Sequence, residues 1–256
     1  MTVSNLKFFA NVASGPSAND GGGAVFNNGG ILNISNSFFL DNVADGAAGS
    51  GGAIFNETNG SLTLSNSEFY KNTAVRAGGA IEDNSGASTT MMITGITADT
   101  NRTEASPGNG GAIHITGAGN AVISGSTFRA NYASAEGGAL WNGAGTMTVS
   151  QTTISDNEAE GAGADQGGGG IYNLSGSLVI KSNVLISNNR ATGAAGSGGG
   201  ILNDVGASLN ISDAIFTSNV SNRAGGAIED VSGDASAVII TRGEFYKNIT
   251  GSSPGN

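Results

Sequence analysis

The chain has 256 residues, of which 44 are glycine, 12% are charged and none is cysteine, and its formal net charge is −10. This charge excludes nucleic acid as an expected partner, because no basic patch is available to neutralise phosphates. The lack of cysteine excludes a disulfide framework and thiolate metal sites. No apolar run approaches the ~18 residues of a membrane span.

The first element in chain order, residues 1–11, contains a motif that returns along the whole sequence. An apolar residue stands three positions before an Asn, and an aliphatic residue stands eight positions before it. Buried polar groups are tolerated when they are hydrogen-bonded, so we expect the Asn side chains to form a structural ladder. The nine pairs are Phe8/Asn11, Phe39/Asn42, Phe69/Asn72, Ala98/Asn101, Phe128/Asn131, Ile154/Asn157, Leu185/Asn188, Phe216/Asn219 and Phe245/Asn248.

The second motif consists of two glycines, a small residue and an aliphatic residue. It occurs eight times along the chain, at nearly regular spacing. Glycine adopts positive φ without steric cost, so we expect each pair to bend the chain tightly into the next strand. The aliphatic positions, which we predict to point into the core, are Val25, Ile54, Ile81, Ile113, Leu140, Ile171, Ile201 and Ile228.

Apolar and polar residues alternate between the two motifs, for example in residues 62–65 and 209–212. Alternation predicts half-buried strands, and a period of about 30 residues predicts a repeat architecture. We therefore predict an all-β fold for residues 1–256, a single domain. The fold is a single-stranded, right-handed parallel β-helix of about nine turns, with strands ~4.8 Å apart and uncapped ends.

A larger repeat is also visible, because residues 76–83 return as residues 223–230, 147 positions later. This spacing indicates that a block of five turns was duplicated. The sequence starts and stops in mid-turn, so we expect it to be a fragment of a longer repeat protein. Uncapped solenoid ends expose strand edges, which makes self-association through them an expected property.

The stretch between each Asn and the next glycine pair varies in length, and is long at residues 12–21 but short at residues 132–136. The distance from each glycine pair to the following Asn is nearly constant. We expect these insertions to lie along one corner of the solenoid, and such a face is often the binding face.

Together, the Gly-Gly-Ala-aliphatic and Phe-x-x-Asn motifs resemble the repeats of the polymorphic outer membrane proteins, best known from Chlamydia. The resemblance covers essentially the whole chain, with Gly170 and Gly200 in place of the Ala and with Ala98, Ile154 and Leu185 in place of the Phe. It implies a parallel β-helix passenger domain that is exported to the bacterial cell surface, where such domains often act as adhesins. The C-terminal membrane barrel of that family is not part of this sequence.

The residue after each inward aliphatic is expected to face outward, because side chains alternate along a strand. An exposed aromatic stripe there is the candidate site for a sugar or a protein partner. Alternatively, these side chains cover the rod or pack beneath the insertion loops. His114 is expected to face solvent. The candidate ligand-binding residues are Phe26, Phe55, His114, Trp141 and Tyr172, and the row also contains Glu82, Leu202 and Glu229.

Two acidic pairs, Glu82-Asp83 and Glu229-Asp230, each follow an arginine, Arg76 or Arg223. Paired carboxylates can bind Ca²⁺ or perform acid–base chemistry. Alternatively, the two Asp residues are variants of an Asn row at Asn27, Asn56, Asn142, Asn173 and Asn203, with each Arg offsetting the nearby charge. We favour the second interpretation and expect no metal and no cofactor.

An enzyme is not expected, because the basic residues do not gather and a single histidine gives no support to a Ser-His-Asp triad. A polysaccharide-acting enzyme remains an alternative, since the fold alone does not decide function. An ice-binding surface would need a regular outward Thr array, and the corresponding row is mostly Ser and is interrupted at Lys181.

The sequence therefore predicts a non-catalytic domain, extracellular or on the bacterial cell surface, associated with the outer membrane in the parent protein. The expected partner is a glycan or protein on a host or neighbouring cell. The main alternative is a purely structural rod that self-assembles or serves as a spacer in a fibre or surface layer.

Overall fold

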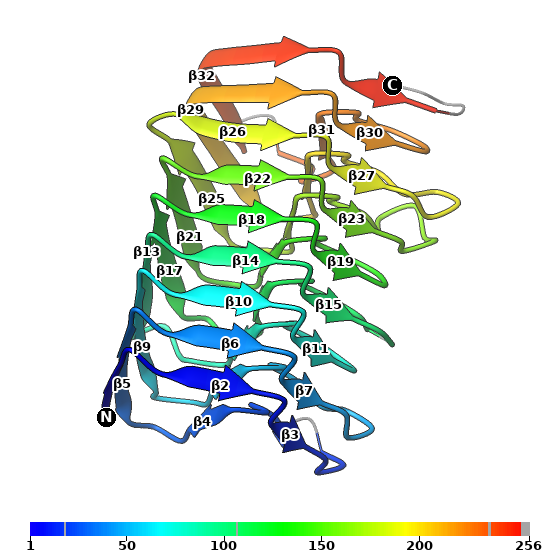
Figure 1. The fold of residues 1–256 in the computed structure, drawn as a ribbon. Coiled ribbons are helices and arrows are strands. Elements are labelled where there is room, and N and C mark those ends of the chain that lie inside the picture. Colours follow the sequence, from blue (N-terminus) through cyan, green and yellow to red (C-terminus); the bar gives the residue numbers. More distant parts are fainter. Residues whose placement is uncertain (18, 106, 235–236, 252–256) are drawn as a thin grey trace.

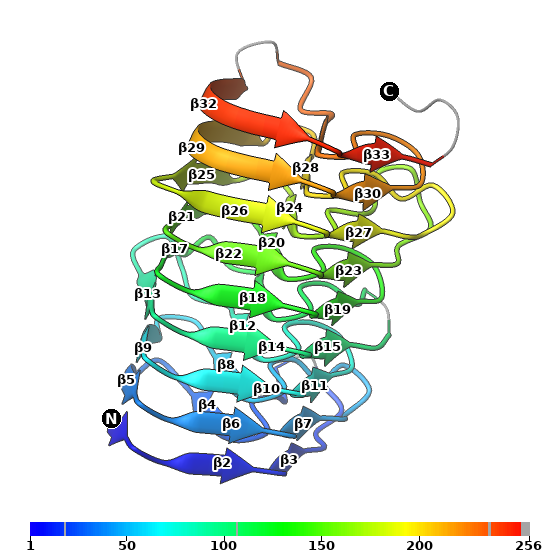
Figure 2. The ribbon, with the colours of Figure 1, turned by 45° about the horizontal axis from the view of Figure 1, so that its top comes forward.

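The chain forms a parallel β-helix in the computed structural model, which describes residues 1–17, 19–105, 107–234 and 237–251. Strands from successive turns lie side by side along the whole molecule (Figures 1 and 2). Every strand pair in the described part is parallel. The described residues contain no helix, so none is present that could cross a membrane. The predicted all-β parallel solenoid is confirmed.

Each turn contributes to three sheets, and the first of these has two arms. One arm contains β1 (Thr2–Ser4), β5 (Ile31–Ser35), β9 (Ser61–Ser65), β13 (Thr90–Thr94), β17 (Asn120–Ser124), β21 (Thr146–Ser150) and β25 (Ser177–Lys181). The other contains β2 (Lys7–Phe9), β6 (Phe38–Leu40), β10 (Glu68–Tyr70), β14 (Thr97–Asp99), β18 (Thr127–Arg129), β22 (Thr153–Ser155) and β26 (Val184–Ser187). The long strands β29 (Ser208–Thr217) and β32 (Val238–Tyr246) join the two arms.

The other two sheets complete each turn. The second sheet contains β3 (Val12–Ala13), β7 (Val43–Ala44), β11 (Thr73–Ala74), β15 (Arg102–Thr103), β19 (Tyr132–Ala133), β23 (Glu158–Ala159), β27 (Arg190–Ala191), β30 (Val220–Ser221) and β33 (Ile249–Thr250). The third contains β4 (Val25–Asn27), β8 (Ile54–Asn56), β12 (Ile81–Asp83), β16 (Ile113–Ile115), β20 (Leu140–Asn142), β24 (Ile171–Asn173), β28 (Ile201–Asn203) and β31 (Ile228–Asp230). The third sheet therefore has eight strands and the second has nine, which corresponds to about eight turns instead of the predicted nine, because the first and last turns are incomplete.

The core lies inside the coil and follows from the alternation in the sequence. In β9, for example, Leu62 and Leu64 are fully buried, whereas Thr63 between them is not. Equivalent residues of neighbouring turns pair directly, so the aliphatic residues form continuous rows. The inward Phe residues stack in the same way, with ring centroids of Phe39 and Phe69 4.6 Å apart. These rows remove apolar surface from water along the whole rod, which is the main stabilising term.

The glycine pairs perform two different tasks, as Gly137 and Gly138 illustrate. Gly137 has a φ of +65°, and the first glycine of every pair has a φ between +59° and +69°. Gly138 has an ordinary φ, but a Cβ there would lie 2.1 Å from the carbonyl oxygen of Gly169 in the next turn. The first glycine therefore permits the bend, and the second permits close approach of two backbones.

The predicted Asn ladder is present. The Asn131 side chain, for example, accepts from Asn101 with its Oδ1 and donates to Asn157 Oδ1 with its Nδ2, at 3.0 and 2.9 Å. It also accepts from the backbone N–H of Asn101 and donates to the carbonyl of Ala98. Each buried Asn thus satisfies its amide group and the backbone around a sharp corner.

The same contacts recur in the first turns of the ladder, at Asn42 and Asn72. Asn42 Nδ2 donates to Asn72 Oδ1 at 2.9 Å, and Asn72 Nδ2 donates to Asn101 Oδ1 at 2.8 Å. The side chains of Asn42 and Asn72 are fully buried, so they bind the turns together and present no group to a ligand. At the two ends of the ladder, Asn11 donates to Asn42 and Asn248 accepts from Asn219, but neither end residue is buried.

One member of the predicted ladder is wrong, because the seventh rung is Asn189 and not Asn188. Asn189 is buried and bonds to Asn157 and Asn219, whereas Asn188 is exposed at the left-handed corner position, with a φ of +55°. The inward residue of this turn is accordingly Ile186 instead of Leu185. An extra residue causes the shift, since Ser150 pairs with Lys181 but Thr153 pairs with Leu185.

Loops of unequal length project along one edge of the rod, after the short strands of the second sheet (Figure 1). The connections that follow the third sheet, such as 28–30 and 143–145, are mostly shorter. The longest insertions therefore lie where the sequence predicts them. Between strand ends, the longest loops are 14–24 and 160–170, those of intermediate length are 45–53, 104–112 and 192–200, and the shortest are 75–80, 134–139 and 222–227.

Candidate functional site

The predicted stripe lies on the third sheet, where each of its residues follows an inward aliphatic residue. Strand pairing places Phe55 next to Glu82, Glu82 next to His114, and His114 next to Trp141. Tyr172, Leu202 and Glu229 continue the row. Trp141, Tyr172 and Leu202 pack together as a cluster of their own, apart from the central core. The stripe thus points away from the core, as expected.

The prediction that this stripe is exposed to solvent is wrong. Trp141 is 6% exposed, and Phe55, His114 and Tyr172 are also buried, so His114 does not face solvent. Phe26, in the first of these strands, is the exception at 49%. Four of the five candidate binding residues therefore present no free face to a ligand.

The loops before the third-sheet strands cover the stripe. A Cβ on Gly137 would lie 3.2 Å from the Cβ of Trp141, so the glycine bend lies close to the base of this side chain. The indole Nε1 of Trp141 donates to Glu136 Oε2 at 3.0 Å, and the Tyr172 hydroxyl lies 3.3 Å from the carbonyl oxygen of Asp165. Packing beneath the loops, the alternative considered above, therefore describes this row.

Within the stripe, the rings form two stacks, one of Phe26 and Phe55 and one of His114, Trp141 and Tyr172. The centroids of His114 and Trp141 are 4.2 Å apart at an interplanar angle of 27°, and those of Trp141 and Tyr172 are 6.0 Å apart at 7°. Phe26 and Phe55 stack at 5.5 Å. Stacking of this kind contributes about 0.5–1.5 kcal/mol per pair beyond burial, so the stripe acts as a second, smaller core.

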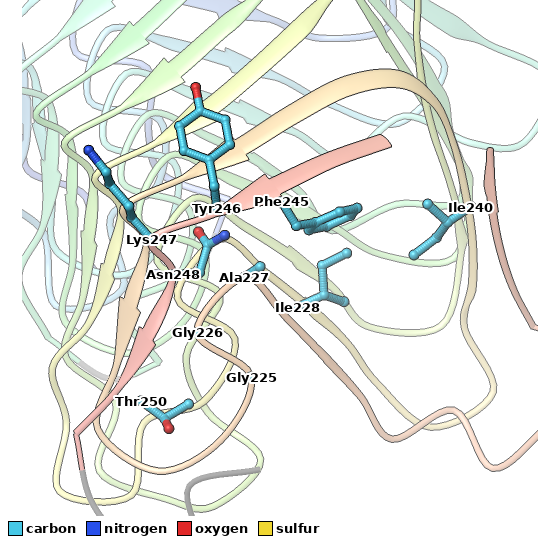
Figure 3. A pocket seen from close by; sticks show the side chains of 10 residues that line it. All are labelled: Gly225, Gly226, Ala227, Ile228, Ile240, Phe245, Tyr246, Lys247, Asn248 and Thr250. Atoms are coloured by element: carbon cyan, nitrogen blue, oxygen red, sulfur yellow. The ribbon is translucent and has the colours of Figure 1, made fainter. Parts of the chain in front are cut away.

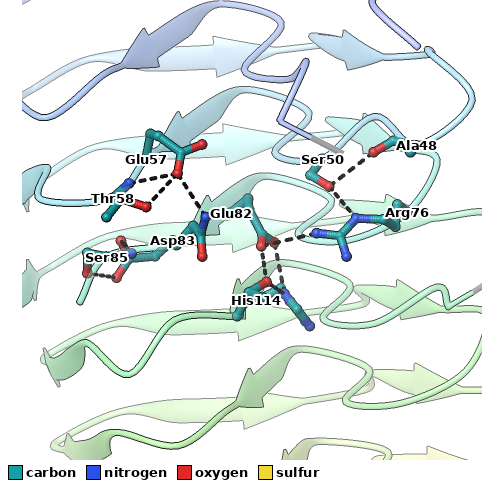
Figure 4. A network of polar contacts seen from close by, with 11 residues as sticks. Ala48, Ser50, Glu57, Thr58, Arg76, Glu82, Asp83, Ser85 and His114 are labelled. Carbon is teal, nitrogen blue, oxygen red and sulfur yellow. Dashed lines mark hydrogen bonds and ion pairs between the residues drawn. The ribbon is translucent and has the colours of Figure 1, made fainter. Parts of the chain in front are cut away.

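A buried polar network interrupts the stack at Glu82 (Figure 4). The Glu82 side chain is fully buried, with Oε2 2.8 Å from His114 Nδ1 and Oε1 3.6 Å from Arg76 Nη2. The hydroxyl of Thr116 also donates to Glu82. Arg76 donates through Nε to Ser50, across the glycine corner. The expectation that the Arg offsets the acidic pair is confirmed for Arg76, and Arg223 lies 3.7 Å from Glu229 in the same way.

Asp83 belongs to a second ladder, as its sequence position predicts. Its Oδ1 accepts from Asn56 Nδ2 at 2.7 Å, and its Oδ2 accepts from the Ser85 hydroxyl at 3.0 Å. Burial raises the pKa of Asp83 to about 6, although the hydrogen bonds from Asn56 and Ser85 lower it. Asp230 accepts from Asn203 in the same manner, at 2.8 Å.

The second ladder is broken at Ile115, the residue that pairs with Asp83 and with Asn142. The side chain of Ile115 has no amide, and Oδ1 of Asn142 is buried without a hydrogen-bond partner among the described residues. A carboxylate accepts hydrogen bonds and needs no acceptor of its own, so Asp83 suits the position below the break. The carboxylates of the two acidic pairs therefore contact neighbouring Asn and Arg side chains of the coil.

Acidic side chains elsewhere do not assemble into a metal site within the described residues. Glu136 bonds to Trp141, and burial raises the pKa of Glu136. Asp204 accepts from the Tyr172 hydroxyl at 2.5 Å. Sequence reasoning missed both carboxylates, because the sequence does not show which loop residue reaches which ring.

Comparison with protein families gave one match. The family model described as "Right handed beta helix region" matches residues 51–245, about three quarters of the chain. No match was found among curated proteins, and none among solved structures.

Proposed function

We propose that this chain, which belongs to the right-handed β-helix family, is a non-catalytic recognition rod of a bacterial cell surface. The proposed partner is a glycan or protein on a host or neighbouring cell. The resemblance of the two repeat motifs to those of the polymorphic outer membrane proteins supports the surface location and the adhesive role. The regular coil then serves as a scaffold, and the recognition surface is the row of corner loops.

The unequal loop lengths are the observation that carries this proposal. The coil repeats its rows from turn to turn, whereas the loops on one edge differ, as the short loop 134–139 and the long loop 160–170 show. Loops on a rigid scaffold are the usual place for binding residues, because length and sequence can vary there without disturbing packing. Buried rings beneath the loops hold them in place, as Trp141 does through Glu136.

The buried acidic network supports a non-catalytic role. Glu82 and His114 have the side-chain types of an acid–base pair, but a substrate cannot reach them without displacing the loops. A general acid or base needs direct or water-mediated contact with the reacting group. Release of products from a polysaccharide panel would contradict this part of the proposal.

A loop-shortened variant tests the recognition role. In it, the five longer loops, at residues 14–24, 45–53, 104–112, 160–170 and 192–200, are each replaced by the short loop 134–139. We expect the parent chain to bind cells or a glycan and matrix-protein array saturably, and the variant to lose this binding while its circular dichroism is unchanged. The control carries Ser65→Ala and Ser124→Ala on the first sheet. Equal binding by the variant, or no saturable binding by the parent, would refute the proposal.

A second candidate function is a self-assembling rod, supported by the surface of the last described turn. Ile240 and Phe245 are 43% and 42% exposed, whereas their equivalents one turn earlier, Ile211 and Phe216, are buried. A cavity of about 660 Å³ opens there (Figure 3), lined by residues of β31, β32 and β33 and by the glycine corner.

The two terminal turns have matching spacing, which favours a head-to-tail contact. Ile240, Phe245 and Asn248 are separated by five and three positions, as are Val3, Phe8 and Asn11. The Asn ladder also has one direction, since each Nδ2 donates to the next turn. A second copy therefore continues the rows only in the same orientation, which gives an open, heterologous contact.

Two charge variants test this second candidate by analytical ultracentrifugation. We expect Phe8→Asp and Phe245→Asp each to be monomeric, and their equimolar mixture to form dimers but nothing longer. Phe9→Asp, on the same strand as Phe8 but pointing outward, is the control and should assemble like the parent. Dimers of either variant alone would indicate a symmetric contact, and a monomeric parent would eliminate self-assembly.

A further inference from the structure

The corner between β25 and β26 differs from the same corner in the neighbouring turns. The turn before has one left-handed residue there, Gln151, and the turn after has Asp213. Here two consecutive residues, Ser182 and Asn183, have φ values of +60° and +62°. Left-handed conformations are unfavourable for residues other than glycine and often occur at functional sites. The extra residue therefore distinguishes this corner from those of the neighbouring turns.

A pocket of about 330 Å³ lies at this corner, on the outer face of three successive turns. Its apolar lining comes from Val184 and Ala214, which are buried, and from Leu185 and Ile215, which are partly exposed. The volume falls at the lower end of the range for small-molecule sites, which are concave and largely apolar with a few polar groups. The pocket lies on a different part of the coil from the corner loops.

Charged and polar side chains complete the lining of this pocket. Arg242 donates through Nε to Asp213 Oδ1 at 2.5 Å and through Nη2 to Asp213 Oδ2 at 2.9 Å. This two-point contact fixes the guanidinium and leaves Nη1 free of that carboxylate. The side chains of Glu244 and Asn183 also line the pocket and make no hydrogen bond within the described residues.

The lining residues indicate which chemical groups a ligand of this pocket would carry. The Glu244 carboxylate is an acceptor for a cation, whereas Arg242 Nη1 and the Asn183 amide are donors for an anion. The apolar walls accept an aliphatic body. We propose that this pocket binds a small zwitterion with an aliphatic side chain, namely a free α-amino acid such as leucine. Its ammonium group bonds to Glu244, its carboxylate to Arg242 and Asn183, and its side chain packs on Leu185 and Ile215.

A matched series of ligands tests each part of this assignment by NMR titration of the whole chain. L-Leucine has all three groups, 4-methylpentanoate lacks the ammonium, 3-methylbutylamine lacks the carboxylate, and L-serine lacks the aliphatic body. We expect leucine to shift the amide signals of residues 183–185 and 213–215 and to bind about tenfold more tightly than each of the others. Leucine binding no tighter than that of the truncated ligands, or glucose binding in its place, would overturn the proposal.

Substitutions in the protein test the same assignment through the residues that line the pocket. The substitution Glu244→Gln should lower the affinity for leucine about tenfold and leave the affinity for 4-methylpentanoate unchanged, because it removes only the partner of the ammonium group. Glu68→Gln is the matched control, since Glu68 lies in the same outward row several turns away. Deletion of Asn183 restores the one-residue corner of the neighbouring turns and should abolish binding. If Glu244→Gln and Glu68→Gln bind leucine equally, the assignment is wrong.

Discussion

At the scale of single residues, the ladder depends on positions that the sequence pattern identifies only approximately. Asn188 and Asn189 are adjacent, and both lie near the expected distance from an apolar residue. Asn189 supplies four hydrogen bonds in the interior, whereas the Asn188 side chain lies at the surface. The two residues therefore contribute to stability by different mechanisms.

Replacement of Asn189 by Ala is expected to lower the free energy of unfolding by about 2–5 kcal/mol, because the buried backbone N–H and the side chain of Asn157 would lose their acceptor. Asn188→Gly, at a left-handed position, should change stability little or increase it, since glycine favours that conformation. Denaturant unfolding of both variants is the measurement. A larger loss in Asn188→Gly than in Asn189→Ala would contradict the corrected ladder.

Asp83 is expected to make stability depend on pH in a direction unlike that of most carboxyl groups. Its pKa is about 6 in the folded state and about 3.9 in an unfolded chain, so the folded state favours the protonated form. This contribution is complete below pH ~4 and is lost as the pH rises through ~6, by about 3 kcal/mol at most.

The variant Asp83→Asn has no titrating group at this position and should therefore lose this part of the pH dependence between pH 4 and 6. Thermal unfolding at several pH values measures the effect. Asp45→Asn, in an exposed loop, is the control and should keep the slope of the parent. If the stability of Asp83→Asn and that of the parent depended on pH in the same way, burial would not shift the pKa of this carboxyl group.

At the scale of elements, each turn is specified by its corners as much as by its strands. The strands are mostly short, and none would be stable alone. Their register is set by the left-handed residues and glycine pairs that fix where each bend occurs. One additional residue at a corner, as before β26, shifts the sequence register of the following strand without disturbing the stacked rows.

Gly138→Ala is expected to destabilise the protein by about 3 kcal/mol or more, because two backbones held by a whole stack of turns cannot separate locally. The added methyl group would lie 2.1 Å from the carbonyl oxygen of Gly169. Gly86→Ala provides the control, since its added Cβ meets nothing within 4 Å, and it should change stability by less than about 0.5 kcal/mol. Thermal unfolding compares the two. Equal melting temperatures would mean that the turns are more loosely stacked than described.

At the scale of the whole molecule, each turn contacts mainly its two neighbours, so stability is distributed along the rod. Strand β17 pairs with β13 on one side and with β21 on the other, whereas β32 pairs with β29 alone among the described strands. Side chains of β32 are correspondingly exposed.

Hydrogen exchange should therefore differ between these strands. We expect amides of β17 and β21 to exchange through opening of several turns, and amides of β32 to exchange faster through local opening, since a terminal strand loses few contacts when it separates. Mass spectrometry after timed deuteration measures this gradient. Uniform protection from β17 to β32 would instead indicate that the solenoid opens as one cooperative unit.

The repeats in the sequence were sufficient to predict the coil: its parallel strands, the inward rows apart from Leu185, the Asn ladder apart from Asn188, and the edge where loops are inserted. These features recur from turn to turn, so their spacing and alternation can be recognised in the sequence. Burial of the aromatic stripe could not be predicted in this way, because it depends on how the loops that carry Glu136 and Asp165 fold back over Trp141 and Tyr172. The structure was also needed to show which of two adjacent Asn residues enters the ladder, and that Arg242 and Glu244 line one pocket. Loop paths, and the side-chain contacts that the loops make, have no period, so they cannot be predicted from a repeating sequence pattern.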